Sequence, residues 1–365
     1  MIAKWFCAIL ALILLTSSLA SAASQTSSLV LEGEGYPRTI TDSAGRTVTI
    51  EMPVNRIIVL NSDAAEAVEV LGAGSKIVGV TDVILRDSER FPNLGDRELI
   101  GSWREFDYEK IGSLAMGDSD RIVPDIVVIG YVYPDRPQGV FAVEESLSSF
   151  ENITPIGLDF FRQETLLDEI EKLGIVLGRE AKAEAVSHWI SSKEGAVKAS
   201  VEGLDRPRVY IESSSVQGLG SLSSYGNGSA SNDLCRIAGG SNIAGDLTEY
   251  PKVEWEWVVS ENPDVIIKIK STSSLGWSDT ADLRAEVDEI KARAGADEVS
   301  AAKSGRVYVC YWPMHFGLNS VVGLTYWAKI FHPDIELDPA IVHEEYMSLL
   351  GQDYPKDRLF VYPDI

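Results

Sequence analysis

The sequence has 365 residues, 45% of them hydrophobic, and a formal charge of −23 at pH 7. So acidic a chain argues against a protein that binds nucleic acid or an anionic membrane, and it suits solubility outside the cell. The chain is also long for a single hydrophobic core, so two domains are expected.

Residues 1–22 are predicted to be a secretory signal peptide. Lys4 supplies the positive start, an apolar run covers residues 5–15, and Ala-Ser-Ala at 20–22 fits the cleavage pattern. The run is too short to span a bilayer, and no lipobox cysteine stands at the cleavage point. We therefore predict an exported protein, periplasmic or at the cell surface, with a Ser/Thr-rich spacer over residues 23–36.

The pattern over residues 37–178 predicts an α/β lobe. "RTITDSAGRTVTI" (38–50) alternates polar and β-branched residues around Ala-Gly, which indicates a hairpin. Apolar runs then alternate with helical patterns, and continuous Val/Ile runs of this kind are typical of parallel sheets covered on both faces. These runs are "RIIVL" (56–60), "KIVGV" (76–80) and "DIVVIGY" (125–131).

Residues 179–203 lack proline and any strand pattern, and they predict one long helix that ends at Gly203. The α/β pattern then restarts over residues 204–365. We therefore predict two Rossmann-like lobes with parallel sheets, joined by one long α-helix, with a ligand cleft between the lobes. One large doubly wound sheet is the alternative.

The sequence carries no recognised catalytic or metal-binding motif. It has no G-x-S-x-G, P-loop, H-E-x-x-H or C-x-x-C, and its four histidines lack metal-ligand spacing. No catalytic residue, metal site or resident cofactor is predicted. Beyond the leader, Cys235 and Cys310 are compatible either with a disulfide or with two buried thiols.

Aromatic residues recur where the predicted strands end. Ligands of open α/β sheets bind outside the carboxyl ends of the strands. Rings offer broad apolar contact, and an arginine can bind a carboxylate or hydroxamate-type oxygen. Each residue alone is compatible with packing, but their recurrence in both lobes predicts a site for a bulky, partly apolar ligand. The candidate ligand-binding residues are Trp103, Arg104, Tyr131, Tyr133, Tyr225, Tyr250, Trp312 and His315.

Several longer segments carry a family resemblance that runs from about residue 37 to about residue 335. They are "RIIVLNSDAAEAVEVLGAGSKIVGVTD", "GSWREFDYEKI", "PDIVVI", and "NDLCRIAGGSNIAGDL" followed by "YPKVEWEWVVSENPDVIIK". Together they resemble the substrate-binding proteins of ATP-driven importers for iron-siderophores, haem and cobalamin. The resemblance implies a monomeric binding protein, not an enzyme, that captures a metal chelate, first of all a ferric siderophore, and delivers it to an ABC permease dimer.

The resemblance also implies a role for two acids. In that family one glutamate on each lobe docks into an arginine pocket of a permease subunit, and the matching residues are Glu109 and Glu256. Two carboxylates held apart by a rigid body match a two-fold arginine pattern, whereas the alternative is a pair of solvated surface acids. Segment 112–122 is longer than in the family, and its effect on Glu109 is left open.

Three other functions are considered. The first is a haem- or corrinoid-binding protein of the same family, with His315 as an axial ligand. The second is an exported chelatase or cofactor-modifying enzyme on this scaffold. The third is a cell-surface interaction protein with a vestigial cleft.

Overall fold

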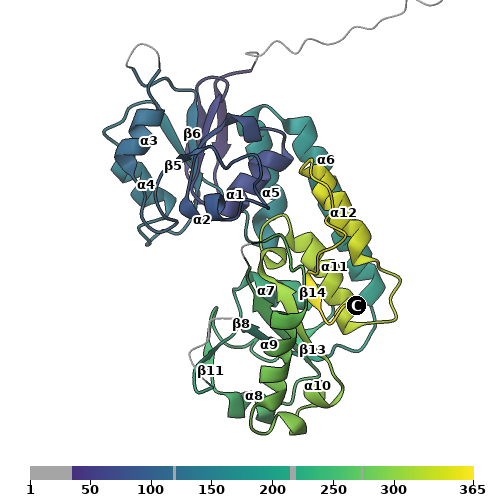
Figure 1. Cartoon of the computed structure of the whole chain (residues 1–365). Helices are drawn as coiled ribbons and strands as arrows, with labels where there is room; N and C mark the ends of the chain where they lie inside the picture. Colours follow the sequence, from purple (N-terminus) through teal and green to yellow (C-terminus); the bar gives the residue numbers. More distant parts are fainter. Residues whose placement is uncertain (1–34, 118–120, 214–218, 273) are drawn as a thin grey trace, which may run out of the picture. The chain divides into compact units, whose positions relative to one another are not determined.

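The computed structural model describes residues 35–117, 121–213, 219–272 and 274–365. Residues 36–365 form one compact unit, and it contains two α/β lobes, each built on its own five-stranded sheet (Figure 1). Among the described residues, no helix is both long enough and apolar enough to cross a membrane. Residues 1–34, which comprise the predicted leader and most of the predicted spacer, lie outside the described part.

The N-terminal lobe opens with the predicted hairpin, formed by antiparallel strands β1 (Arg38–Thr41) and β2 (Thr47–Ile50). Its five-stranded sheet is entirely parallel, in the order β5-β4-β3-β6-β7. These strands are β3 (Arg56–Val59), β4 (Ile77–Val80), β5 (Glu98–Leu99), β6 (Ile126–Gly130) and β7 (Ile153–Gly157). All five residues of β6 are buried, which explains its continuous apolar run.

Helices cover both faces of this sheet, as Figure 1 shows. Alternate residues of β3 and β6 point to opposite faces: Ile58 and Val128 pack with α3 and α4, whereas Ile57 and Val127 belong to the core shared with α1 and α5. The helices are α1 (Ser62–Val70), α2 (Asp82–Arg86), α3 (Tyr108–Leu114), α4 (Val140–Leu147) and α5 (Gln163–Leu177).

The predicted long helix is α6 (Glu180–Val201), which has 22 residues and is therefore about 33 Å long. The chain turns into it at Gly178, which adopts the left-handed conformation (φ 65°) that ends α5. A Cβ at Gly174 would lie 2.5 Å from Cβ of Ala183, so a glycine is required where α5 and α6 meet. α6 also packs against a helix of the second lobe, α11 (Ser320–Phe331).

The C-terminal lobe has a sheet in the order β10-β8-β12-β13-β14. Four of these strands are parallel, whereas β14 pairs antiparallel with β13, so the sheet is mixed at one edge. Strand bounds are β8 (Arg208–Ser213), β10 (Ser241–Asn242), β12 (Val265–Lys270), β13 (Val307–Tyr311) and β14 (Val361–Tyr362). A separate antiparallel pair is formed by β9 (Leu222–Ser223) and β11 (Lys252–Val253).

The helices of this lobe follow the predicted pattern closely. They are α7 (Ala230–Ile237), α8 (Trp255–Glu261), α9 (Ala281–Ala292), α10 (Ser300–Lys303), α11 (Ser320–Phe331) and α12 (Pro339–Leu349), with a 3-10 turn over Trp312–His315. α12 packs against α11 and is tied to α6, because Glu345 accepts a 2.7 Å hydrogen bond from Trp189 Nε1 and pairs with Lys193 at 2.6 Å.

The two cysteines of the described chain are free and buried. This result settles the alternative that the sequence left open: the thiols of Cys235 and Cys310 do not form a disulfide. Burial raises the pKa of the Cys310 thiol to about 12 and raises that of Cys235 further. Both side chains therefore act as small apolar core residues.

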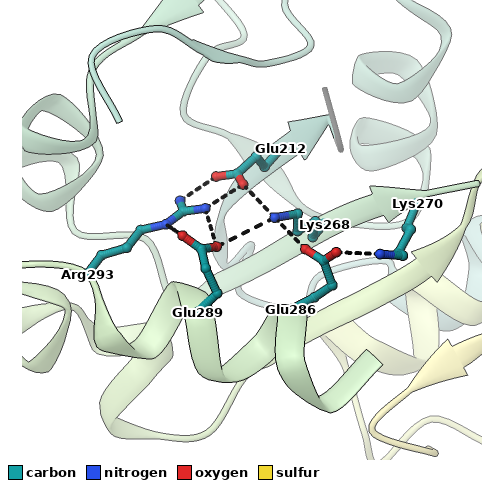
Figure 2. Close-up of polar contacts among 6 residues, drawn as sticks. All are labelled: Glu212, Lys268, Lys270, Glu286, Glu289 and Arg293. Carbon is teal, nitrogen blue, oxygen red and sulfur yellow. Dashed lines mark hydrogen bonds and ion pairs between the residues drawn. The ribbon is translucent and has the colours of Figure 1, made fainter. Parts of the chain in front are cut away.

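A buried ionic network lies between the second sheet and α9 (Figure 2). Arg293 makes a bidentate pair with Glu212 at 2.6 and 2.8 Å, and Lys268 lies 2.7 Å from Glu286 and 3.4 Å from Glu212. Burial alone would lower the pKa of Lys268, but the hydrogen bond to Glu286 and the surrounding carboxylates raise it. The network is thus a structural link between β8, β12 and α9, because its charges are satisfied by one another.

Candidate functional site

Two tyrosines stand at the carboxyl end of β6. Tyr131 and Tyr133 are stacked with their ring centroids 5.4 Å apart, and the guanidinium of Arg136 lies 4.3 Å from the centre of the Tyr133 ring. The loop is tightly closed, since a Cβ at Gly139 would lie 1.8 Å from the carbonyl oxygen of Tyr133. The sheet edge therefore presents a fixed pair of rings with a cation on one of them.

The segment that follows the neighbouring strand β7 adds a third ring and a second cation. Phe161 lies 6.2 Å from the Tyr133 ring, and the guanidinium of Arg162 lies 5.0 Å from the centre of Phe161. Phe160 has a positive φ of 59°, and the buried carboxylate of Glu169 accepts a 2.6 Å hydrogen bond from its backbone N–H. This unusual backbone angle is thus stabilised from the core, and it sets the direction of the next two side chains.

The C-terminal lobe contributes two further tyrosines on adjoining loops. The rings of Tyr225 and Tyr250 meet edge to face, with centroids 5.9 Å apart. Their loops are joined by backbone hydrogen bonds, including 2.6 Å from Gly226 N to Glu249 O and 2.6 Å from Asn227 N to Leu247 O. Tyr225 is buried, whereas Tyr250 remains 48% exposed, so Tyr250 is the accessible ring of this pair.

These groups from the two lobes face one another. Helix α5, which begins beside Arg162, packs against α7, and the side chain of Gln163 hydrogen-bonds with Ser320 of α11. The charges of Arg162 and Arg136 reach the phenol of Tyr250, and burial, together with Tyr250, raises the pKa of Tyr133 to about 12. We call this group the tyrosine–arginine site, which consists of Tyr131, Tyr133, Arg136, Phe161, Arg162, Tyr225 and Tyr250.

Three other predicted ligand-binding residues lie elsewhere in the fold. The guanidinium of Arg104 lies 4.3 Å from the centre of the Trp103 ring, on the loop between β5 and α3. Trp312, 36% exposed, packs against Phe316 at 4.8 Å on the turn after β13. Among the described residues, no aromatic or ionic contact joins these side chains to the tyrosine–arginine site.

His315 is fully buried. Its Nδ1 lies 3.1 Å from the carbonyl oxygen of Trp312, its ring packs on Trp327 at 4.9 Å, and Nε2 is enclosed without a hydrogen-bond partner in the described chain. Burial lowers the pKa of His315 to about 4, so the ring is neutral at physiological pH. The ring packs as part of the core, and both of its nitrogens are enclosed in this structure.

The two predicted docking acids occupy corresponding places in their lobes. Glu109 lies in the first turn of α3 and Glu256 in the first turn of α8, and both are exposed. Trp255, beside Glu256, anchors its helix by donating a 2.8 Å hydrogen bond to the carbonyl of Ala294. An acid in a first turn is also favoured by the helix dipole, so this position alone does not separate docking from a structural role.

A buried acid cluster is a feature that sequence reasoning missed. Asp63 and Glu66 lie on α1, and Arg90 Nη2 lies 3.1 Å from Glu66 and 3.9 Å from Asp63. The second lobe closes over it: Gln352 donates a 3.1 Å hydrogen bond to the carbonyl of Arg90, and Gly317 lies against both acids. Burial raises the pKa of Asp63 to about 7. The available signal was the presence of three acids, Asp63, Glu66 and Glu69, in an otherwise mostly apolar first helix.

Arg136 and Arg162 were also missed. Each follows an aromatic residue closely in sequence, which was the available signal, but their placement beside Tyr250 depends on how the two lobes meet. Among the described residues, no group of three or more His, Cys, Asp or Glu side chains has an arrangement that could hold a metal ion. The groups that the site offers to a ligand are therefore rings, hydroxyls and guanidinium groups.

Comparison with known proteins identifies the family. The sequence profile described as periplasmic binding protein matches residues 57–311, well over half of the chain. An uncharacterized ABC transporter substrate-binding lipoprotein of Bacillus subtilis is 24% identical over 83% of this chain and 88% of its own length. A cobalamin-binding protein of Halobacterium salinarum is 25% identical over 64% of this chain, which spans 58% of that relative.

A solved structure gives the same fold. The TroA-like periplasmic binding protein FepB from Veillonella parvula has a TM-score of 0.68 at 22% identity, with 87% of this chain and 98% of that chain covered. Its likeness concerns the arrangement of two α/β lobes. With the profile match across both lobes, it leads to one conclusion: the chain belongs to the periplasmic binding protein family.

Proposed function

We propose that this protein is the exported substrate-binding component of an ABC importer and that it captures a metal chelate, with a ferric siderophore as the first candidate. The observation that carries the proposal is the tyrosine–arginine site, in which rings and cations of the N-terminal lobe lie within electrostatic range of Tyr250 of the second lobe. A bulky organic ligand with polar oxygens matches such a surface. Membership of a family of binding proteins, rather than of enzymes, supports it.

Delivery to a permease is the second part of the proposal. The Bacillus subtilis relative carries the name of an ABC transporter component, which supports this kind of partner. Glu109 and Glu256, exposed on the first turns of α3 and α8, are the proposed docking residues. Their carboxylates would pair with cationic pockets of the membrane subunits.

A corrinoid is the second candidate ligand, favoured by the cobalamin-binding relative from Halobacterium salinarum. Because His315 is buried, this candidate would rely on the rings of the tyrosine–arginine site and not on an axial imidazole.

The experiment is a fluorescence titration of the exported form with a ferric hydroxamate, a ferric catecholate, haemin and cyanocobalamin. We expect at least one chelate to bind at micromolar concentration or better, and Tyr133→Ala to weaken it. Glu109→Ala and Glu256→Ala provide the matched controls, since they should keep ligand affinity and lose stimulation of permease ATP hydrolysis. If none of the four chelates binds, the proposed function is wrong.

A further inference from the structure

Arg136 and Arg162 are unusual cations in so acidic a protein, which has 55 acidic and 32 basic residues. Each guanidinium lies over an aromatic ring, at 4.3 Å from the centre of Tyr133 and 5.0 Å from that of Phe161. Within the described part of the chain, neither side chain has a carboxylate at ion-pair distance or donates a hydrogen bond to the protein. Buried or half-buried arginines elsewhere, such as Arg90 and Arg293, are paired with glutamates.

Two acids interact electrostatically with Arg162. Asp159, whose charge interacts with Arg162, is buried next to Glu169, and burial raises its pKa to about 7. Asp233 on α7 also interacts with Arg162, and burial raises its pKa as well. Arginine keeps its proton at neutral pH, so both guanidinium groups carry positive charge at this place, although the protein as a whole is negative.

The geometry leaves the donor groups of both arginines available. A guanidinium that lies over a ring contacts it through one flat face of the guanidinium group. Its N–H groups point outward in the guanidinium plane, where they can donate to a pair of oxygen atoms. Arg136 and Arg162 are both exposed, and the 48% exposed ring of Tyr250 lies within the reach of their charges. Rings for an apolar body thus stand beside unused donors for anionic oxygens.

We infer that Arg136 and Arg162 are the charge-selecting residues of the tyrosine–arginine site, and that its ligand is an anionic chelate which presents carboxylate or catecholate oxygens. Neutral hydroxamate chelates and neutral corrinoids can accept hydrogen bonds from an arginine, but they bring no net negative charge to balance the two guanidinium groups. This inference rests on the proposed function, because it assigns the charge of the ligand at the same site. The two arginines would select ligands by charge, which aromatic rings alone do not do.

The test is calorimetric titration of the whole exported protein with probes of different charge. Ferric catecholate, ferric citrate and haemin are the anionic probes, whereas a ferric hydroxamate and cyanocobalamin are the neutral ones. We expect at least one anionic probe to bind about tenfold or more tightly than either neutral probe, with an affinity that falls as salt is added. The three anionic probes distinguish catecholate from carboxylate oxygens.

Variants then assign the selectivity to residues. Arg136→Gln and Arg162→Gln should each weaken the anionic probe by roughly tenfold, because each removes a charged hydrogen bond, and should weaken the neutral probes clearly less. Arg162→Lys should bind the anionic probe more tightly than Arg162→Gln but less tightly than the parent, since lysine keeps the positive charge and lacks the planar pair of N–H donors. Arg284→Gln, on the exposed face of α9, is the matched control and should change nothing.

Two kinds of result would overturn the inference, and they show whether the proposed function fails with it. If a neutral chelate binds as tightly as the anionic probes, or if both glutamine variants weaken neutral and anionic probes alike, the charge selection is wrong and the proposed function stands. If no chelate of either charge binds at micromolar concentration, both fail. Circular dichroism and thermal unfolding of each variant separate a lost contact from a lost fold.

Discussion

Asp63 offers a direct test of the energetics at the junction of the two lobes. Its carboxyl group is buried on α1, 3.9 Å from Arg90, which is already engaged by Glu66 at 3.1 Å. Burial and the charge of Glu66 raise the pKa of Asp63 from 3.8 to about 7, although Arg90 opposes them. The perturbation is Asp63→Asn, which removes the titrating proton with almost no change of shape.

The sign and size follow from proton linkage. Because the folded state holds this proton more tightly than the unfolded state, the free energy of unfolding falls as pH rises from about 4 to about 7. The difference between 3.8 and about 7 corresponds to a cost on the order of 4 kcal/mol above pH 7. The asparagine variant lacks this cost, so its advantage over the parent should appear as pH rises and become constant above about 7.

The assay is urea unfolding, followed by tryptophan fluorescence at pH 4, 6 and 8. Glu69 and Asp159, whose pKa values burial also raises to about 7, contribute to the parent's pH dependence, so the informative quantity is the difference between variant and parent. Asp297→Asn, at an exposed position, is the control and should give one small difference at every pH. A difference for Asp63→Asn that stays flat, or grows toward acid pH, would show that the Asp63 carboxyl does not carry a raised pKa in the folded protein.

Two further predictions concern the core. Lys268→Met should lower the free energy of unfolding by about 3 kcal/mol, because it removes the central buried cation of the network and leaves Glu212 with Arg293 alone and Glu286 with Lys270 alone. Lys356→Met, whose partner Glu344 lies 3.8 Å away on the surface, should have no measurable effect in the same denaturant titration. An unchanged midpoint for Lys268→Met would mean that the network contributes little. Gly317→Ala should destabilise by about 1–3 kcal/mol, because φ is 62° and the new Cβ would lie 2.9 Å from Asp63 Oδ1. Gly351→Ala is the control, because Gly351 has a similar φ of 70° and a Cβ there would have no atom within 4 Å, so its effect reports only the cost of a positive φ for alanine. Equal unfolding midpoints for the two variants would show that crowding against Asp63 is absent.

Much of the fold could be predicted because its elements have strong periodic patterns. The run at 125–131 became β6 (Ile126–Gly130), and the proline-free stretch at 179–203 became α6 (Glu180–Val201). Strands of two residues, such as β5 and β14, carry no such pattern. The antiparallel edge was missed for this reason, since pairing between β13 and β14 joins distant parts of the chain.

The site could be predicted only in part, because sequence shows where strands end and not which side chains meet. Tyr131 and Tyr133 follow a strand end, and their rings stack on each other. The loop residues Tyr225 and Tyr250 also meet, with their rings edge to face. The participation of Arg136 and Arg162 requires tertiary contacts that no spacing encodes. His315 follows β13 in the same way but turns into the core.

The inert thiols of Cys235 and Cys310 have a practical consequence for observing motion. Since both are enclosed, a cysteine introduced at exposed position 109 or 256 would be the reactive thiol of the described chain, with no need to alter the native pair. Nitroxide labels at these two positions would let pulsed electron paramagnetic resonance record the separation of α3 and α8 with and without a chelate. The change in that separation would measure how far the lobes move when a ligand is captured.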